Sequence, residues 1–173
     1  MPVISKKICL IGDFNVGKTS LIRRFIEDKF SDKYLTTIGV KISRKSVVLE
    51  STAQQINLLV WDIEGHTKQK SIPKSYLQGA HGAIIVGDLT RMETLERISY
   101  HINQFLQINP RCKAMVALNK SDLLSSEKLQ QLVQLHDYSD REQIINTYIT
   151  SAKTGNQVNT MFEQLAASTV AGS

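Results

Sequence analysis

The 173-residue sequence predicts an α/β protein in which a mostly parallel β-sheet carries helices on both faces. Short apolar runs alternate along the chain with segments of helical periodicity, a pattern typical of strand–helix–strand units. One further run alternates apolar and polar residues, as a half-exposed edge strand does. An apolar content of 42% and a charged content of 21% are ordinary for a folded protein, and no repeat or low-complexity tract divides the chain. We therefore expect a single domain over residues 1–173.

Each element follows from its own pattern. Five short apolar runs predict buried parallel strands, at residues 8–11, 56–63, 83–86, 114–118 and 144–149. Residues 40–49 predict an edge strand paired antiparallel with the run from residue 55, because apolar Val40 and Ile42 alternate with polar neighbours. Helical spacing is found in three sets of apolar residues: Leu21, Ile22, Phe25 and Ile26; Leu95, Ile98, Ile102 and Phe105; and Val158, Met161, Phe162 and Leu165. Ligands of such sheets bind beyond the carboxyl ends of the strands, so the residues that follow the strands indicate function.

The first predicted strand is followed by a phosphate-binding loop. Residues 12–19 read Gly-Asp-Phe-Asn-Val-Gly-Lys-Thr, a full match to GxxxxGK[ST]. The backbone N–H groups of such a loop and the start of the following helix surround phosphate oxygens. Lys18 is expected to bind the β- and γ-phosphates, and the Thr19 hydroxyl to coordinate Mg²⁺. We expect the nucleotide phosphates to contact Asn15, Val16, Gly17, Lys18, Thr19 and Ser20.

A second motif, Asn119-Lys120-Ser121-Asp122, follows the predicted strand 114–118. An Asp carboxylate only accepts hydrogen bonds, so Asp122 matches the two donors of guanine, N1–H and N2–H₂. Adenine lacks this pair and would leave the carboxylate unpaired, which can reject it by a factor of about 10⁴. Together with the phosphate-binding loop and the later Ser151-Ala152-Lys153, this motif predicts a site for GTP or GDP.

On these motifs the chain resembles the small GTPases of the Ras superfamily, most closely the Rab branch, over essentially its whole length. Residues 34–40 resemble the Rab switch I segment, residues 61–65 resemble its WDxxG element, and residues 75–82 resemble the segment after switch II. The resemblance implies a P-loop small G domain with a six-stranded sheet and one antiparallel strand. It also implies a molecular switch that binds GTP or GDP with Mg²⁺ and hydrolyses GTP to GDP. The departures at Phe14 and His66, described below, predict that hydrolysis is slow.

The resemblance implies roles for individual residues as well. Phe30 would stack on the guanine, and the base would be bound by Asn119, Lys120, Asp122, Ser151, Ala152 and Lys153. Thr37 would bind both Mg²⁺ and the γ-phosphate, and Asp62 would hold Mg²⁺ through water. Gly65 would donate its N–H to the γ-phosphate. Lys18 and Thr37 would be catalytic residues for GTP hydrolysis, together with the residue that orients the attacking water, a position that His66 occupies here.

Three of the departures from the family pattern bear on the γ-phosphate end of the site. His66 stands where a glutamine normally orients the attacking water; it could accept a proton from water, or it could be an exposed loop residue without a catalytic role. Phe14 is bulky where these loops hold a small residue, so it covers the phosphates or packs on a neighbour, and it could obstruct a catalytic side chain from a partner. We expect Glu64 to face solvent, away from the γ-phosphate. Two interpretations stay open: a slow GTPase switch, or a non-catalytic GTP-binding scaffold whose hydrolysis is lost through Phe14 and His66.

The expected partners are proteins. The resemblance implies effectors, exchange factors and GTPase-activating proteins that bind the switch regions, at a patch of Ile42, Trp61 and Tyr76, although the two aromatic residues could equally belong to the core. The net charge of +5 is uneven, since residues 1–75 carry 13 basic and 7 acidic side chains. No nucleic-acid-binding module accompanies this charge, so we expect no nucleic-acid partner.

Localisation signals are few. No apolar run approaches the length of a membrane span, and two cysteines without a CxxC pair suit a reducing compartment. Residue 2 is proline and no cysteine follows Cys112, so we expect no lipid anchor in this chain. The expected location is cytoplasmic, with membrane association only through a lipidated tail beyond Ser173 or through a partner.

Overall fold

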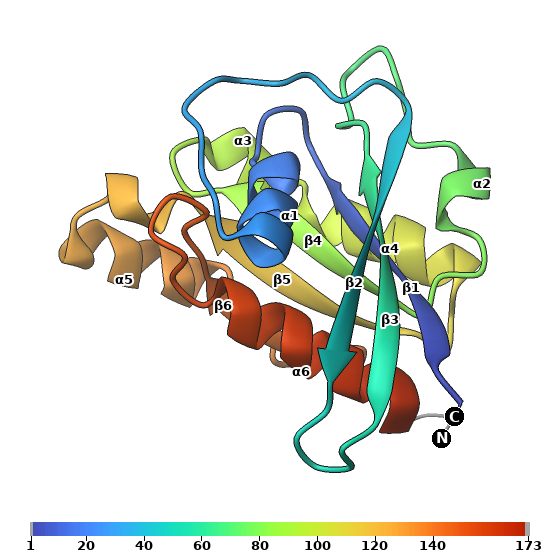
Figure 1. The fold of residues 1–173 in the computed structure, drawn as a ribbon. Coiled ribbons are helices and arrows are strands. Elements are labelled where there is room, and N and C mark those ends of the chain that lie inside the picture. Colours follow the sequence, from blue (N-terminus) through green and yellow to red (C-terminus); the bar gives the residue numbers. More distant parts are fainter. Residues whose placement is uncertain (1, 172–173) are drawn as a thin grey trace.

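The computed structural model describes residues 2–171, and its central element is a mixed β-sheet (Figure 1). Within this part of the chain, six strands pair in the order β2-β3-β1-β4-β5-β6. β2 runs antiparallel to β3, and all other neighbouring strands run parallel. The α/β class and the antiparallel edge strand are therefore confirmed. The strands are β1 (Ile4–Gly12), β2 (Val40–Val48), β3 (Gln55–Ile63), β4 (Gly82–Asp88), β5 (Lys113–Asn119) and β6 (Ile144–Ile149).

Helices cover both faces of the sheet, as predicted (Figure 1). One face packs against α1 (Lys18–Glu27) and α6 (Val158–Ala171). The other face carries α2 (Lys74–Leu77), α3 (Met92–Glu96), α4 (Ile98–Ile108) and α5 (Ser126–Leu135), with a 3-10 turn, η1 (Ser121–Leu123), before α5. The helical pattern through Leu95 and Phe105 is divided at Arg97, which separates α3 from α4.

Alternation along the strands decides which helices each core residue meets. In β1, Ile8 and Leu10 belong to the core beneath α1 and α6, whereas Cys9 and Ile11 belong to the core on the opposite face. All four side chains are at most 1% exposed. A strand buried on both faces in this way needs a continuous apolar run, which is the signal that the sequence carries.

The loops that follow the parallel strands leave the sheet at one common edge, away from the N-terminus (Figure 1). The loop after β1 leads into α1, the loop after β3 leads toward α2, and the loops after β5 and β6 precede η1 and α6. The phosphate-binding loop, residues 64–65, the loop that begins after Asn119 and residues 151–153 all follow parallel strands, so the topology brings them together at this edge. The segment that resembles switch I lies between α1 and β2.

No helix within residues 2–171 has the length and apolar character needed to cross a membrane. The chain end at Ser173, beyond which a lipidated tail was considered, lies outside the described residues.

Candidate functional site

The loop between β1 and α1 wraps around the side chain of Lys18. Asn15 and Gly17 turn the chain with positive φ angles of 62° and 100°. Lys18 is 6% exposed, and its Nζ donates to the carbonyl oxygens of Gly12 at 3.1 Å and Asp13 at 2.8 Å. Burial lowers the pKa of Lys18 to about 8, although the charges of Asp62 and Asp13 raise it. Within residues 2–171 the hydrogen-bond partners of this ammonium are carbonyl groups, and a buried charge without an ionic partner is costly, so a bound anion would stabilise it.

Gly17 cannot carry a side chain at this point. A Cβ there would lie 2.3 Å from Nδ2 of Asn119, and the φ of 100° is itself strained for other residues. Asn119 occupies this space because its Nδ2 donates to the carbonyl of Val16 at 3.0 Å. The phosphate-binding loop and the Asn119 loop are therefore in direct contact.

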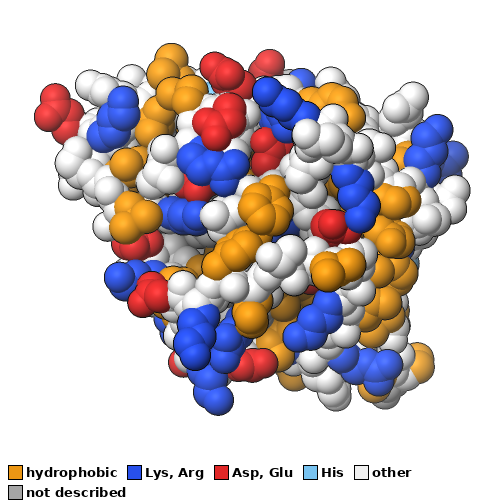
Figure 2. Space-filling model, turned by 90° about the horizontal axis from the view of Figure 1, so that it is seen from above, with side chains coloured by type: hydrophobic (Ala, Val, Ile, Leu, Met, Phe, Trp, Pro, Cys, Tyr) orange, Lys and Arg blue, Asp and Glu red, His pale blue; other side chains and the backbone are white. Residues whose placement is uncertain are grey.

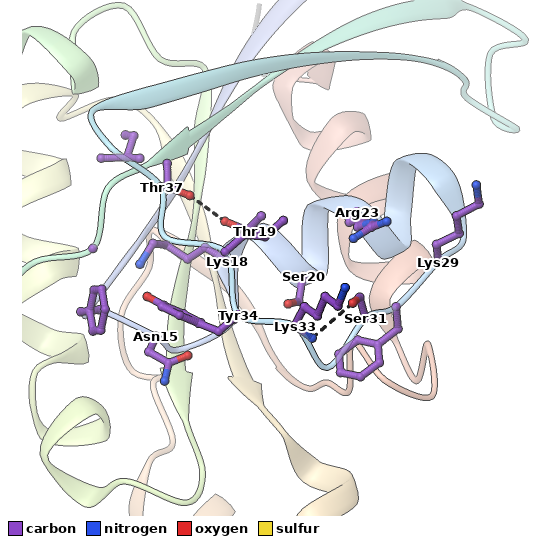
Figure 3. Close-up of a pocket in the computed structure, with 16 residues that line it drawn as sticks. Asn15, Lys18, Thr19, Ser20, Arg23, Lys29, Ser31, Lys33, Tyr34 and Thr37 are labelled. Atoms are coloured by element: carbon purple, nitrogen blue, oxygen red, sulfur yellow. Dashed lines mark hydrogen bonds between the residues drawn. The ribbon is translucent and has the colours of Figure 1, made fainter.

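A pocket opens above Lys18 and α1 (Figure 3). Most of the phosphate-site residues expected from the sequence line it: Asn15, Gly17, Lys18, Thr19, Ser20, Thr37 and Gly65. Phe30 lines this pocket and also an adjoining cavity. The expected base-site residues that border the cavity are Asn119, Lys120, Asp122, Ala152 and Lys153. Two expected residues lie behind the surface, because Val16 and Ser151 are at most 1% exposed.

Oxygen atoms of three residues converge at one end of the pocket. The hydroxyl of Thr19 donates to Asp62 Oδ2 at 2.6 Å and lies 2.9 Å from the hydroxyl of Thr37 (Figure 3). The second carboxylate oxygen, Asp62 Oδ1, is buried without a hydrogen-bond partner among the described residues. Burial raises the pKa of Asp62, against the hydrogen bond from Thr19. Hydroxyl and carboxylate oxygens are ligands that suit Mg²⁺, and an orphaned buried carboxylate oxygen fits a nearby cation, so these residues could hold one.

The base-side loops are fixed by hydrogen bonds. Lys120 Nζ donates to the carbonyl of Asn15 at 2.9 Å and pairs with Asp88 at 2.8 Å. Ser151 donates to Asp122 Oδ1 at 2.7 Å, which orients the carboxylate that is expected to read guanine. These bonds join the loops after β1, β5 and β6 into one rim.

Arg24 of α1 supports the same rim and was not predicted. Its Nε donates to the carbonyl of Ala152 at 2.8 Å and its Nη2 to that of Lys153 at 2.6 Å. The neighbouring Arg23 makes only a 3.4 Å pair with Glu27 one helical turn away. Nothing in the sequence distinguishes the two arginines, since both follow the motif on a helix.

The sequence of residues 7–171 matches the Ras family. The chain belongs to the Ras family. Relatives include the Ras-related protein Rab-5B of Plasmodium falciparum, 34% identical over 92% of this chain and 75% of the relative. Rab-13 of Bos taurus is 35% identical over 92% of the chain and 77% of the relative, and the GTP-binding protein YPTM2 of Zea mays is 35% identical over 94% and 78%. The resemblance to Rab proteins is thus confirmed.

In this Ras-family chain, His66 lies against the phosphate-binding loop but not in the Lys18 pocket. Its backbone forms a short bridge with the loop, donating to the Gly12 carbonyl at 3.0 Å and accepting from Phe14 N–H at 3.1 Å. The imidazole Nδ1 lies 3.1 Å from Arg97 Nη1 and 3.8 Å from Asp13 Oδ1. The side chain is 13% exposed, so the alternative of an exposed loop residue is wrong. A role in hydrolysis remains a prediction.

The Asp13 carboxylate lies at the centre of a cluster with His66, Arg97 and His101. Its Oδ1 lies 2.8 Å from Nε2 of the fully buried His101, and its Oδ2 lies 3.3 Å from Arg97. Burial alone would raise the pKa of Asp13, but the hydrogen bond from His101 and the charge of Arg97 hold it below its ordinary value. Burial lowers the pKa of His66, and His101 and Arg97 lower it further. Ligand atoms of Asp13, His66 and His101 lie within 4.8 Å of one another, yet the Arg97 guanidinium already pairs with two of them, so we assign no metal there.

Glu64 does not face solvent as expected. Its Oε2 accepts from Gly39 N–H at 2.9 Å and from Lys70 Nζ at 2.8 Å, and its side chain is 23% exposed. The expectation was wrong because repulsion from a phosphate was the only force considered. The two donors hold the carboxylate between Gly39, in the segment that resembles switch I, and Lys70, in residues 66–74, which correspond to switch II. They also keep the pKa of Glu64 below its ordinary value.

The expected partner patch is partly exposed. Ile42 is 51% exposed and lies opposite Trp61 across the β2–β3 pair. Trp61 and Tyr76 are half-buried and pack against the core, and Lys7 Nζ lies 3.6 Å from the centre of the Trp61 ring. The face seen in Figure 2 mixes Lys and Arg side chains with acidic and hydrophobic ones.

Phe14 packs on a neighbour, as one of its two alternatives predicted. It is 40% exposed and meets the ring of Tyr34 edge to face, with 5.4 Å between ring centres. Both aromatic residues line the Lys18 pocket, so they narrow its outer side. The carbonyl of Phe14 accepts a hydrogen bond from Arg91 at 2.9 Å.

Proposed function

We propose that this Ras-family protein is a Rab-like GTPase that binds GTP or GDP together with Mg²⁺ and hydrolyses GTP slowly. One observation carries the proposal: the pocket over the buried Lys18 ammonium, with Thr19 and Thr37 bonded to Asp62 at one end, shares a wall that includes Asn15 and Phe30 with the cavity bordered by Asp122. A nucleoside di- or triphosphate has charged, metal-binding phosphate oxygens at one end and a base at the other, which matches this arrangement.

Each group has a distinct task in binding. Lys18 neutralises phosphate oxygens, and the loop N–H groups and the start of α1 add partial positive charge. Bound Mg²⁺ would neutralise further phosphate charge, held by Thr19, Thr37 and Asp62. Asp122, fixed by Ser151, accepts hydrogen bonds from the guanine donors. Because Thr37 belongs to switch I and Gly65 to switch II, binding of the γ-phosphate at this end would order both loops.

The geometry around His66 supports slow hydrolysis. The imidazole is directed toward Asp13 and Arg97, and the lowered pKa keeps it neutral near pH 7. For Ras, a system used as a reference for this chemistry, unassisted turnover is roughly 10⁻⁴ s⁻¹. We expect turnover no faster than this, because the residue at the water-orienting position is held elsewhere. If hydrolysis is lost altogether, the protein is the non-catalytic GTP-binding scaffold.

Protein partners would read the switch loops. We propose that effectors, exchange factors and GTPase-activating proteins contact the patch of Ile42, Trp61 and Tyr76, where an exposed apolar side chain lies beside half-buried aromatic ones. We place the protein in the cytoplasm, since Cys9 and Cys112 are both free thiols.

Fluorescent GDP binding tests the proposal. Lys18→Ala should weaken GDP affinity roughly 100-fold, because a buried charge-assisted contact is lost. Lys68→Ala, at an exposed lysine of switch II, is the matched control and should bind as the wild type does. The nucleotide that co-purifies separates the two interpretations: GDP indicates a working cycle and GTP a scaffold. Equal loss of affinity in both variants, or no binding by the wild type, would contradict the proposal.

A further inference from the structure

Two hydrogen bonds of opposite direction join Glu64 to Gly39. The Glu64 N–H donates to the Gly39 carbonyl at 2.8 Å, and the Glu64 carboxylate accepts from the Gly39 N–H at 2.9 Å. The last regular pair of the β2–β3 ladder is Val40 with Ile63, directly next to these residues. The Glu64 side chain therefore extends the ladder by one step into the switch loops.

The backbone of Gly39 explains why a side chain is used. Gly39 has a φ of 70°, outside the range of a strand, so its peptide departs from the regular direction of β2. A carboxylate can accept from an N–H in this position, whereas an alanine side chain would offer no acceptor.

Lys70 provides the second attachment. Its Nζ lies 2.8 Å from the same oxygen, Glu64 Oε2, that accepts from Gly39. Lys70 is itself fixed in a tight turn, because its N–H donates to the hydroxyl of Thr67 at 3.1 Å. One carboxylate oxygen thus connects the end of switch I with a turn of switch II.

We propose that Glu64 is a positioning residue that holds switch I closed over the metal end of the pocket, whether or not a γ-phosphate is present. Gly39 lies two residues after Thr37, whose hydroxyl is 2.9 Å from that of Thr19. Fixing Gly39 therefore restrains the loop that carries Thr37. The inference rests on the proposed function, since it concerns release of the bound nucleotide. It implies slow GDP release and a switch I that changes less between GDP and GTP than the order–disorder model requires.

The rate of GDP release tests this role. The preloaded protein is chased with unlabelled GDP, and Glu64→Ala should release fluorescent GDP roughly tenfold faster than the wild type, because a charge-assisted bond to switch I is lost. Glu64→Gln keeps an acceptor for Gly39 N–H and should stay within roughly threefold of the wild type. Lys70→Ala should release GDP at a rate between those of Glu64→Gln and Glu64→Ala, and Lys68→Ala should release it as fast as the wild type does. Equal release by Glu64→Ala and the wild type would overturn the inference, and so would release by Glu64→Gln as fast as by Glu64→Ala.

Amide hydrogen exchange gives a readout that needs no nucleotide. In the wild type the Gly39 N–H should be protected in NMR exchange experiments, and Glu64→Ala should speed its exchange roughly tenfold while Gln restores protection. An unprotected Gly39 amide in the wild type would refute the link. Failure of the wild type to bind GDP would instead refute the proposed function, and exchange at Gly39 would still decide whether the two loops are joined.

Discussion

Replacing Arg24 with alanine should loosen the loop that borders the base end of the pocket. The substitution removes two hydrogen bonds from a guanidinium to the carbonyls of Ala152 and Lys153, and the Arg24 side chain is only 17% exposed. It also removes exposed contacts with Asp28 one helical turn away, which match the Arg23–Glu27 pair of the control below. Hydrogen bonds to a charged group contribute about 1.5–3 kcal/mol each after exchange with water is counted, and less where solvent reaches the pair, as at the carbonyl of Lys153. We therefore expect the free energy of unfolding to fall by about 1–3 kcal/mol. GDP affinity should fall roughly tenfold, because the loop of residues 152–153 must then be ordered on binding.

Arg23→Ala is the matched control for unfolding, since Arg23 lies on the same helix and pairs with Glu27 in an exposed i, i+4 contact. That pair should contribute less than about 1 kcal/mol. Arg23 also borders the Lys18 pocket, so its effect on GDP affinity is compared with that of Arg24→Ala rather than taken as zero. Urea unfolding of the nucleotide-free protein and titration with fluorescent GDP measure the two effects separately. If Arg24→Ala and Arg23→Ala behaved alike in both measurements, the assignment of Arg24 to the base loop would be refuted.

Three further outcomes follow from the site. Gly17→Ala should destabilise the protein by about 1–3 kcal/mol and abolish tight GDP binding, because a Cβ would lie 2.3 Å from the Asn119 amide at a positive φ; thermal unfolding and GDP titration check this. His66→Gln should hydrolyse GTP roughly tenfold faster in a single turnover, and an unchanged rate would remove His66 as the cause of slow hydrolysis. His66 has a folded-state pKa below 6.5, so the unfolded chain binds its proton first as the pH falls, and stability is lost below pH 6.5. Between pH 7.5 and 5.5, the free energy of unfolding measured in urea should fall less for His66→Gln than for the wild type. Equal pH dependence in the two proteins would contradict the assignment of this loss to His66.

The sheet was predictable because burial on both faces requires apolar runs, and the alternation of Val40 and Ile42 marks the exposed edge. Helix α5 was not predicted, although Leu129, Leu132 and Val133 have helical spacing and Ser125 caps it by accepting from Lys128 N–H. The interruption at Arg97 could not be predicted, because periodicity is insensitive to a departure at one residue.

The candidate site was predictable wherever a motif demands a residue type at a fixed spacing, as for Lys18, Thr19 and Asp122. The contacts that surround these motifs were not. Arg24 meets residues 152 and 153 only after folding, and Asp13, His66 and His101 come from three separate segments. The position of Glu64 was predicted wrongly because its partner Gly39 lies in a separate segment, the loop before β2, and a local consideration of charge does not include it.

Calorimetric titration of the nucleotide-free protein with GTP, GDP and ATP in the presence of Mg²⁺ tests whether the pocket binds guanine nucleotides selectively. We expect tight binding of both guanine nucleotides and an affinity for ATP lower by about 10⁴, because adenine leaves the Asp122 carboxylate unpaired. Equal affinity for ATP and GTP, or no heat of binding with any of the three at millimolar concentration, would contradict it.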